Sequence, residues 1–132
     1  MESKASSQSA AVALTIAGSG SGANAGIQTD LKAFSANGAF SASVIRCTTA
    51  QNPDGAAPIH PIPPESVVSQ IEQVVTFCKP RSIKTGMLYS TPIINAVSES
   101  LDQLKSTAAI VVDPVMIATS GKTLIERQWW IR

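Results

Sequence analysis

The sequence predicts an α/β domain with a mainly parallel sheet, of the doubly wound kind or closely related to it. Short apolar runs rich in β-branched residues alternate along the chain with amphipathic helical patterns. Each connection between two runs is long enough to return the chain for parallel pairing. With 132 residues, 44% of them hydrophobic and 14% charged, the composition is that of one globular domain with a single core.

The first predicted unit is a strand, a helix and a second strand. Residues 11–17, AVALTIA, form an apolar run of strand length. A helix begins at Ile27, where apolar residues recur at i, i+4 and i+7, and the Asn-Gly pair at 37–38 closes it. Residues 40–50, FSASVIRCTTA, have the pattern of the second strand.

A proline-rich stretch then separates this unit from the rest of the chain. Residues 51–64 hold five of the eight prolines, so we expect no regular structure there. A second helix is predicted over 67–78, ending before Pro80, and a short third strand over 82–88.

The last predicted helix and strand lie beyond residue 90. Thr91 and Pro92 suit a helix start, with a capping hydroxyl and a proline in the first turn. The buried face of this helix should consist of Ile94, Val97, Leu101 and Leu104. Residues 108–116, AAIVVDPVM, are apolar on both faces, as a central parallel strand is.

Charge and cysteine content argue against several classes of function. The formal net charge is +1 without a cluster of Lys or Arg, which argues against nucleic acid or a membrane surface as a partner. No apolar run approaches the roughly 18 residues of a membrane span. Cys47 and Cys78 match no metal or redox spacing, so we expect reduced, buried packing residues and a cytoplasmic location. Residues 1–10 lack the apolar core of a signal peptide and are expected to form a disordered tail.

Ligands of open α/β sheets bind outside the carboxyl ends of the strands. The predicted strands end in GSG (18–20), TAQN (49–52), TGM (85–87) and DPVM (113–116). These ends carry small residues, a side-chain amide, a thioether and an acid. The opposite edge carries Lys79, Arg81 and Lys105, which are typical of caps and turns. We therefore expect the chemistry at the first edge.

The glycines that follow the first strand can be compared with two phosphate-binding patterns. G-x-G-x-x-A at 18–23 formally fits a dinucleotide fingerprint, but the second strand ends without the acid that would bind the ribose. The GKT at 121–123 resembles the end of a P-loop, but Met116 stands where that pattern needs glycine. Neither phosphate site is predicted.

Six stretches together resemble the hydroxymethylpyrimidine and phosphomethylpyrimidine kinases of thiamine biosynthesis, members of the ribokinase-like superfamily. They are LTIAGS, AGIQTDLKAFSANG, TAQN, KTGML, VVDPVM and ATSG, in the family's order and spacing. The resemblance implies a three-layer αβα fold with about four β-α units. Residues 11–125 would then be the N-terminal part of a kinase domain, and 126–132 a divergent tail.

Family enzymes use ATP and Mg²⁺ to phosphorylate 4-amino-5-hydroxymethyl-2-methylpyrimidine, and then its monophosphate. By position, the resemblance places this aminopyrimidine near Gly18, Asp30, Thr49, Gln51, Met87 and Val115, and it places Asp113 near Mg²⁺. Gln51 can donate and accept at an aminopyrimidine edge, and Met87 offers the ring a polarisable surface. The glycines would let the backbone pass beside the ring.

These residues also have plainer structural interpretations. Asp30 could be a solvated acid, which is favourable near a helix N-terminus. Met87 could be a residue of the core, and Gln51 could be a turn residue before Pro53. Their joint placement at one sheet edge favours the functional interpretation.

The sequence departs from the family pattern in ways that bear on activity. Gly20 replaces an acid, and Arg46 and Cys47 stand where small or apolar residues are usual. The family's Asn-x-x-Glu and Gly-Thr-Gly-Cys motifs, which accompany its catalytic groups, do not occur in the 132 residues. We therefore expect a truncated chain that retains no catalytic residue, is not a competent kinase alone and exposes a bare strand edge.

Two other functions stay open. The chain could be a non-catalytic pyrimidine-binding or regulatory module, acting as a homo-oligomer or paired with a full-length homologue. It could also be a relative of the pyridoxal kinases in the same superfamily.

Overall fold

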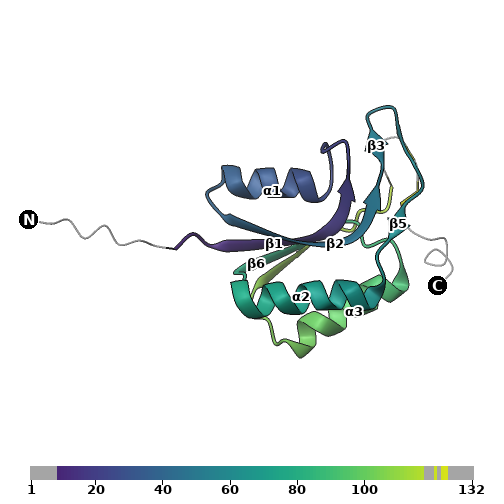
Figure 1. The fold of residues 1–132 in the computed structure, drawn as a ribbon. Helices are drawn as coiled ribbons and strands as arrows, with labels where there is room; N and C mark the ends of the chain where they lie inside the picture. Colours follow the sequence, from purple (N-terminus) through teal and green to yellow (C-terminus); the bar gives the residue numbers. More distant parts are fainter. Residues whose placement is uncertain (1–8, 118–120, 122, 125–132) are drawn as a thin grey trace, which may run out of the picture.

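The computed structural model describes residues 9–117, 121 and 123–124. One helix covers one face of a five-stranded sheet and two helices cover the other (Figure 1). The helices are α1 (Ile27–Ala36), α2 (Pro64–Cys78) and α3 (Thr91–Gln103). The strands of this sheet are β1 (Val12–Gly20), β2 (Phe40–Thr49), β5 (His60–Pro61), β6 (Ser82–Thr85) and β7 (Ala109–Val112). The predicted C-terminal tail at 126–132 and most of the predicted N-terminal tail lie outside the described residues.

The sheet has the order β5-β2-β1-β6-β7. Strands β1, β2, β6 and β7 pair in parallel, whereas β5 pairs antiparallel to the end of β2. The three-layer α/β fold with a mainly parallel sheet is therefore confirmed. No helix in the described part of the chain is long and apolar enough to cross a membrane.

The two faces of the sheet carry different residues. A closed apolar core lies between the sheet and helices α2 and α3. It is formed by Leu14, Ile16, Val44, Val67, Ile71, Ile83, Ile93, Val97 and Leu101. Because successive strand residues point to opposite faces, Ala13, Thr15 and Ala17 of β1 face α1 instead. Lys84 of β6 pairs with Thr15 and shares this second face.

The proline-rich stretch is more regular than predicted. Strands β3 (Gln51–Asn52) and β4 (Gly55–Ala56) form a short antiparallel hairpin, and β5 follows. Asn52 Oδ1 closes the turn by accepting hydrogen bonds from the backbone N–H groups of Asp54 and Gly55, at 2.9 and 3.1 Å. Pro61 is tolerated because β5 lies at a sheet edge, where a missing N–H costs little.

Four other local predictions need correction. The last helix has Ser90, not Thr91, as its N-cap, and no side-chain hydrogen bond caps it. On its buried face Ile93 replaces Ile94, which is only half-buried. The third strand ends at Thr85, and the fourth is limited to Ala109–Val112.

Strand β7 lies at the edge of the sheet and not in its centre. Its residues Ile110, Val111 and Val112 are 49%, 58% and 66% exposed. An apolar run therefore lies uncovered within the described structure, which confirms the expected bare strand edge.

Candidate functional site

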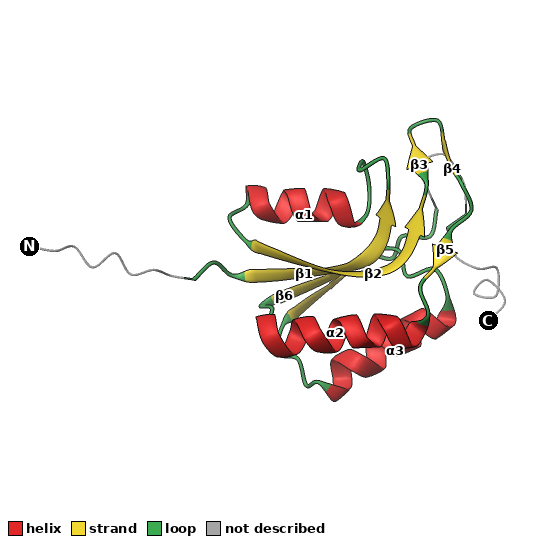
Figure 2. Ribbon diagram, viewed as in Figure 1, coloured by secondary structure: helices red, strands yellow, loops and turns green. Residues whose placement is uncertain are grey.

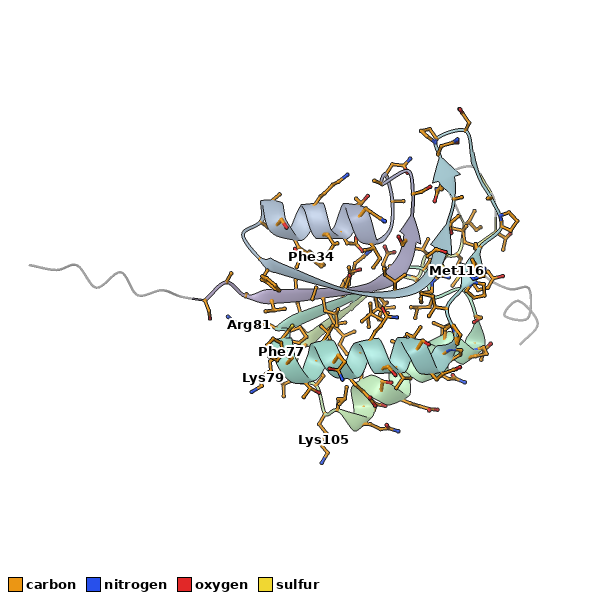
Figure 3. All side chains as sticks on the ribbon, in the orientation of Figure 1. Phe34, Phe77, Lys79, Arg81, Lys105 and Met116 are labelled. Atoms are coloured by element: carbon orange, nitrogen blue, oxygen red, sulfur yellow. The ribbon has the colours of Figure 1, made fainter. Side chains whose placement is uncertain are left out.

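The carboxyl ends of the parallel strands lie at the same end of the sheet, next to the β3–β4 hairpin (Figure 2). We call this end of the sheet the carboxyl edge. Met116 lies at this end of the molecule, whereas Lys79, Arg81 and Lys105 lie at the other (Figure 3). Lys79 caps the C-terminus of α2 in a left-handed backbone conformation, which is typical of a residue that only ends a helix. The two edges thus have the different compositions that the sequence predicts.

The loop after β1 is fastened to the end of β2. Gly20 pairs with Thr49, and the Ser21 N–H donates to the Thr49 carbonyl at 3.0 Å. The Ser21 hydroxyl accepts from the Gln51 N–H at 2.8 Å and lies 3.1 Å from the Gln51 carbonyl, to which it can donate. Hydrogen bonds of the Ser21 backbone and hydroxyl therefore hold Thr49 and Gln51, both predicted site residues, beside this loop.

The glycines of this loop have reasons within the protein itself. A β-carbon at Gly18 would lie 2.8 Å from Cys47 Sγ, and one at Gly22 would lie 2.7 Å from the Gln51 carbonyl oxygen. Gly26 has φ +70°, and a β-carbon there would lie 2.4 Å from the Gly18 carbonyl oxygen. Close packing of protein on protein explains these glycines without a ligand ring beside them.

The Gln51 side chain lies beside a hollow and is free to bind a ligand. Among the described residues nothing hydrogen-bonds to its carboxamide, and its Oε1 lies 2.9 Å from the place of a β-carbon on Gly20. A hollow of about 550 Å³ opens beside it. That hollow is lined by Ser21, Ala50, Gln51, Asn52, Asp54, Gly55 and Ala57. Of the predicted residues, only Gln51 lines it.

Asp30 is neither solvated nor free. Its carboxylate accepts a hydrogen bond from Thr15 Oγ1 at 2.6 Å and lies 3.0 Å from Lys84 Nζ through both oxygens. The Asp30 side chain is only 14% exposed. The interpretation of Asp30 as a solvated first-turn acid is therefore wrong. A ligand that donates a hydrogen bond to this carboxylate would share it with Lys84.

Lys84 is a candidate for the site that the sequence analysis did not single out. Its Nζ lies between Asp30 and Asp113, with 3.8 Å to Asp113 Oδ2. The KTGML stretch contains Lys84, but only the pairing of β6 with β1 brings it to Asp30. The cation thus pairs with two acids at the edge where the strands end.

Asp113 is the more accessible of the two acids, with its side chain 50% exposed. In the described part of the chain, no group of three His, Cys, Asp or Glu side chains is arranged to hold a metal ion. A Mg²⁺ ion bound mainly through nucleotide phosphates and water needs only one or two carboxylates. Asp113 fits that limited role.

Met87 and Val115 are both half-buried. Met87 is joined to β2 because its carbonyl oxygen accepts a hydrogen bond from Arg46 Nε. Arg46 is 1% exposed, and the centroid of the Tyr89 ring lies 5.5 Å from its guanidinium carbon. Burial lowers the pKa of Arg46 below its ordinary value, against smaller opposing effects of Cys47 and Tyr89.

The family model for phosphomethylpyrimidine kinase matches residues 20–130. The chain belongs to this family. It is 47% identical over 115 residues to the hydroxymethylpyrimidine/phosphomethylpyrimidine kinase of Haemophilus influenzae, covering 87% of this chain and 42% of that protein. The Bacillus subtilis enzyme of the same name is 42% identical over 113 residues, with 86% and 41% covered.

Solved structures agree with this assignment. The phosphomethylpyrimidine kinase of Clostridium difficile superposes with a TM-score of 0.83 at 43% identity, covering 89% of this chain and 50% of that one. A Bacillus subtilis pyridoxal kinase, solved as an ADP complex, gives a TM-score of 0.76 at 29% identity, with 88% and 44% covered. The chain thus spans about two fifths to one half of the lengths of these relatives.

Proposed function

We propose that these 132 residues form the acceptor side of a pyrimidine kinase and bind hydroxymethylpyrimidine at the carboxyl edge of the sheet. The observation that carries this proposal is the Gln51 carboxamide, which has no hydrogen-bond partner among the described residues and which Ser21 holds next to Gly20 and Thr49. A side-chain amide offers one donor and one acceptor face, which an aminopyrimidine edge complements. Asp30, Met87 and Val115 would complete the contact with the ring.

ATP would be the phosphoryl donor, with Asp113 as one carboxylate near its Mg²⁺. Among the structural relatives, a Staphylococcus aureus pyridoxal kinase was solved with AMP-PCP and pyridoxal. Transfer depends on positioning and on stabilising the charge of the moving phosphoryl group. Lys84, which lies 3.8 Å from Asp113, would be one cation near that charge. We propose that transfer needs further groups beyond these 132 residues.

Titration calorimetry with 4-amino-5-hydroxymethyl-2-methylpyrimidine, with and without Mg-ATP, tests the proposal. We expect saturable heat that Mg-ATP leaves nearly unchanged. Absence of heat from folded protein would contradict acceptor binding. A parallel titration with pyridoxal separates this proposal from the pyridoxal alternative, and the higher identity to the pyrimidine kinase structure favours the pyrimidine.

Replacing Gln51 by Ala should weaken pyrimidine binding by about 1–3 kcal/mol, because a buried polar edge of the ligand loses its partner. Gln73→Ala is the matched control, since it removes an exposed amide of α2 that lines no part of this hollow. Unchanged affinity in Gln51→Ala would remove Gln51 from the site.

A second candidate is a non-catalytic module that pairs with another chain. The exposed apolar residues of β7 favour it, because an open strand edge readily pairs with a further strand. Such a module would be a homo-oligomer or would pair with a longer homologue. Sedimentation over a range of concentrations distinguishes a defined complex from a monomer.

We also propose a reducing, cytoplasmic location, supported by the two free cysteines Cys47 and Cys78. Two plant relatives are named chloroplastic. Localisation of the tagged protein in intact cells tests this proposal.

A further inference from the structure

Arg46 is a buried cation that forms no ion pair within the described part of the chain. Its side chain is 1% exposed, and its Nε donates to the Met87 carbonyl. The two terminal nitrogens, Nη1 and Nη2, are buried and have no hydrogen-bond partner among the described residues. Buried polar groups are nearly always paired, and an unpaired buried charge is costly. Such a group calls for an explanation.

The acids nearest in the site do not supply the missing anion. Asp30 is hydrogen-bonded to Thr15 and paired with Lys84, whose Nζ also lies 3.8 Å from Asp113. Arg46 instead faces Tyr89, the Cys47 side chain and the Met87 backbone. Among the described residues, Asp30 and Asp113 therefore both lie beside Lys84, and neither pairs with Arg46.

The guanidinium lies between two residues assigned to the acceptor site. A β-carbon added at Gly18 would lie 3.1 Å from Nη2, and Nε donates a hydrogen bond to the Met87 carbonyl oxygen. Gly18 follows the point in β1 where the register with β2 shifts, so that it pairs with Cys47 and leaves room for Arg46. A larger residue than glycine at position 18 would occupy this room.

The aromatic partner of Arg46 belongs to a loop and not to the core. Tyr89 is half-buried, lies between β6 and α3, and has φ +74°, a left-handed conformation that is strained for a bulky residue. Its ring interacts with the guanidinium through a cation–π contact of 5.5 Å. A ligand could reach the guanidinium only if a group packed on it, such as this ring, moved aside.

We propose that Arg46 binds a phosphate group, and that the phosphate it takes is that of a phosphorylated acceptor, the pyrimidine monophosphate. The identity of the acceptor rests on the proposed function above. Two parallel N–H groups match two phosphate oxygens, which a neutral hydroxymethyl group cannot replace. Arg46 would therefore bias the site toward the second, phosphorylated acceptor.

Titration calorimetry compares the monophosphate with the neutral hydroxymethylpyrimidine. In the unaltered chain we expect the monophosphate to bind about 10- to 100-fold more tightly, as a hydrogen-bonded charge pair does. That ratio should fall to about 1 in Arg46→Met and stay reduced in Arg46→Lys, which keeps the charge but loses the fork. Arg81→Gln, an exposed arginine at the opposite edge, is the matched control and should keep the ratio.

Thermal unfolding with inorganic phosphate alone separates the two sources of phosphate. Arg46→Met should fold and unfold at a higher temperature than the unaltered chain without ligand, because it removes an unpaired buried charge. If inorganic phosphate stabilises the unaltered chain but not Arg46→Met, and the monophosphate gains nothing over the neutral pyrimidine, the site binds free phosphate and the acceptor assignment is overturned. If no phosphate effect depends on Arg46, the whole inference is overturned. Failure of the neutral pyrimidine to bind contradicts only the proposed function.

Discussion

Leu14 and Thr15 are neighbours in β1, and they face opposite sides of the sheet. Leu14 belongs to the apolar cluster with α2 and α3, whereas Thr15 donates a hydrogen bond to Asp30 in α1. Both side chains are fully buried. The face toward α2 and α3 is thus held by apolar packing, and the face toward α1 by a polar chain.

That polar chain runs from Thr15 through Asp30 and Lys84 to Asp113. It begins beneath α1 and ends at the carboxyl edge, where the candidate site lies. The difference between the faces indicates a division of tasks, since packing on one side stabilises the fold and charge on the other side is directed toward the site. Substitutions on the two faces should therefore have different consequences.

The largest effect is expected on the apolar face. Leu14→Ala should lower the free energy of unfolding by about 2–5 kcal/mol, because it leaves a cavity in a closed core. Thr15→Val, one residue further, keeps the volume and removes only the hydrogen bond to Asp30, so about 1 kcal/mol is expected. Urea unfolding measures both. Equal losses would contradict the division between the faces.

The ion pair on the α1 face should contribute less to the free energy of unfolding than the Leu14 side chain does. Asp30→Asn removes the charge opposite Lys84, and we expect a loss of about 1–2 kcal/mol, between exposed and buried ion pairs. A double-mutant cycle with Lys84→Met isolates the coupling between the two side chains. Glu72→Gln, on the exposed side of α2, is the control and should leave stability unchanged. A coupling near zero would show that the pair does not act as a unit.

The order of helices and parallel strands could be predicted from the sequence, because hydrophobic period and helix-ending residues are local signals. Lys84 could not be linked to Asp30, because the two are 54 positions apart and meet only through the pairing of β1 with β6. The two-residue strands β3 and β4 also escaped prediction, since they are too short to show a period. Arg46 stands where the family pattern has small or apolar residues, so its type is unusual in the sequence alone. Its burial depends on the fold and could not be predicted.

The smallest effect on stability is expected in strand β7, because its apolar residues are exposed and belong to no closed core. Val112 is 66% exposed, so Val112→Lys should change the unfolding free energy of the monomer by less than about 0.5 kcal/mol. A lysine on an open edge opposes strand pairing, so any self-association seen in sedimentation should decrease. Thr107→Lys adds the same charge in the exposed turn before β7 and should leave association unchanged. If both variants reduce association equally, net charge and not the strand edge governs it, and β7 is no pairing surface.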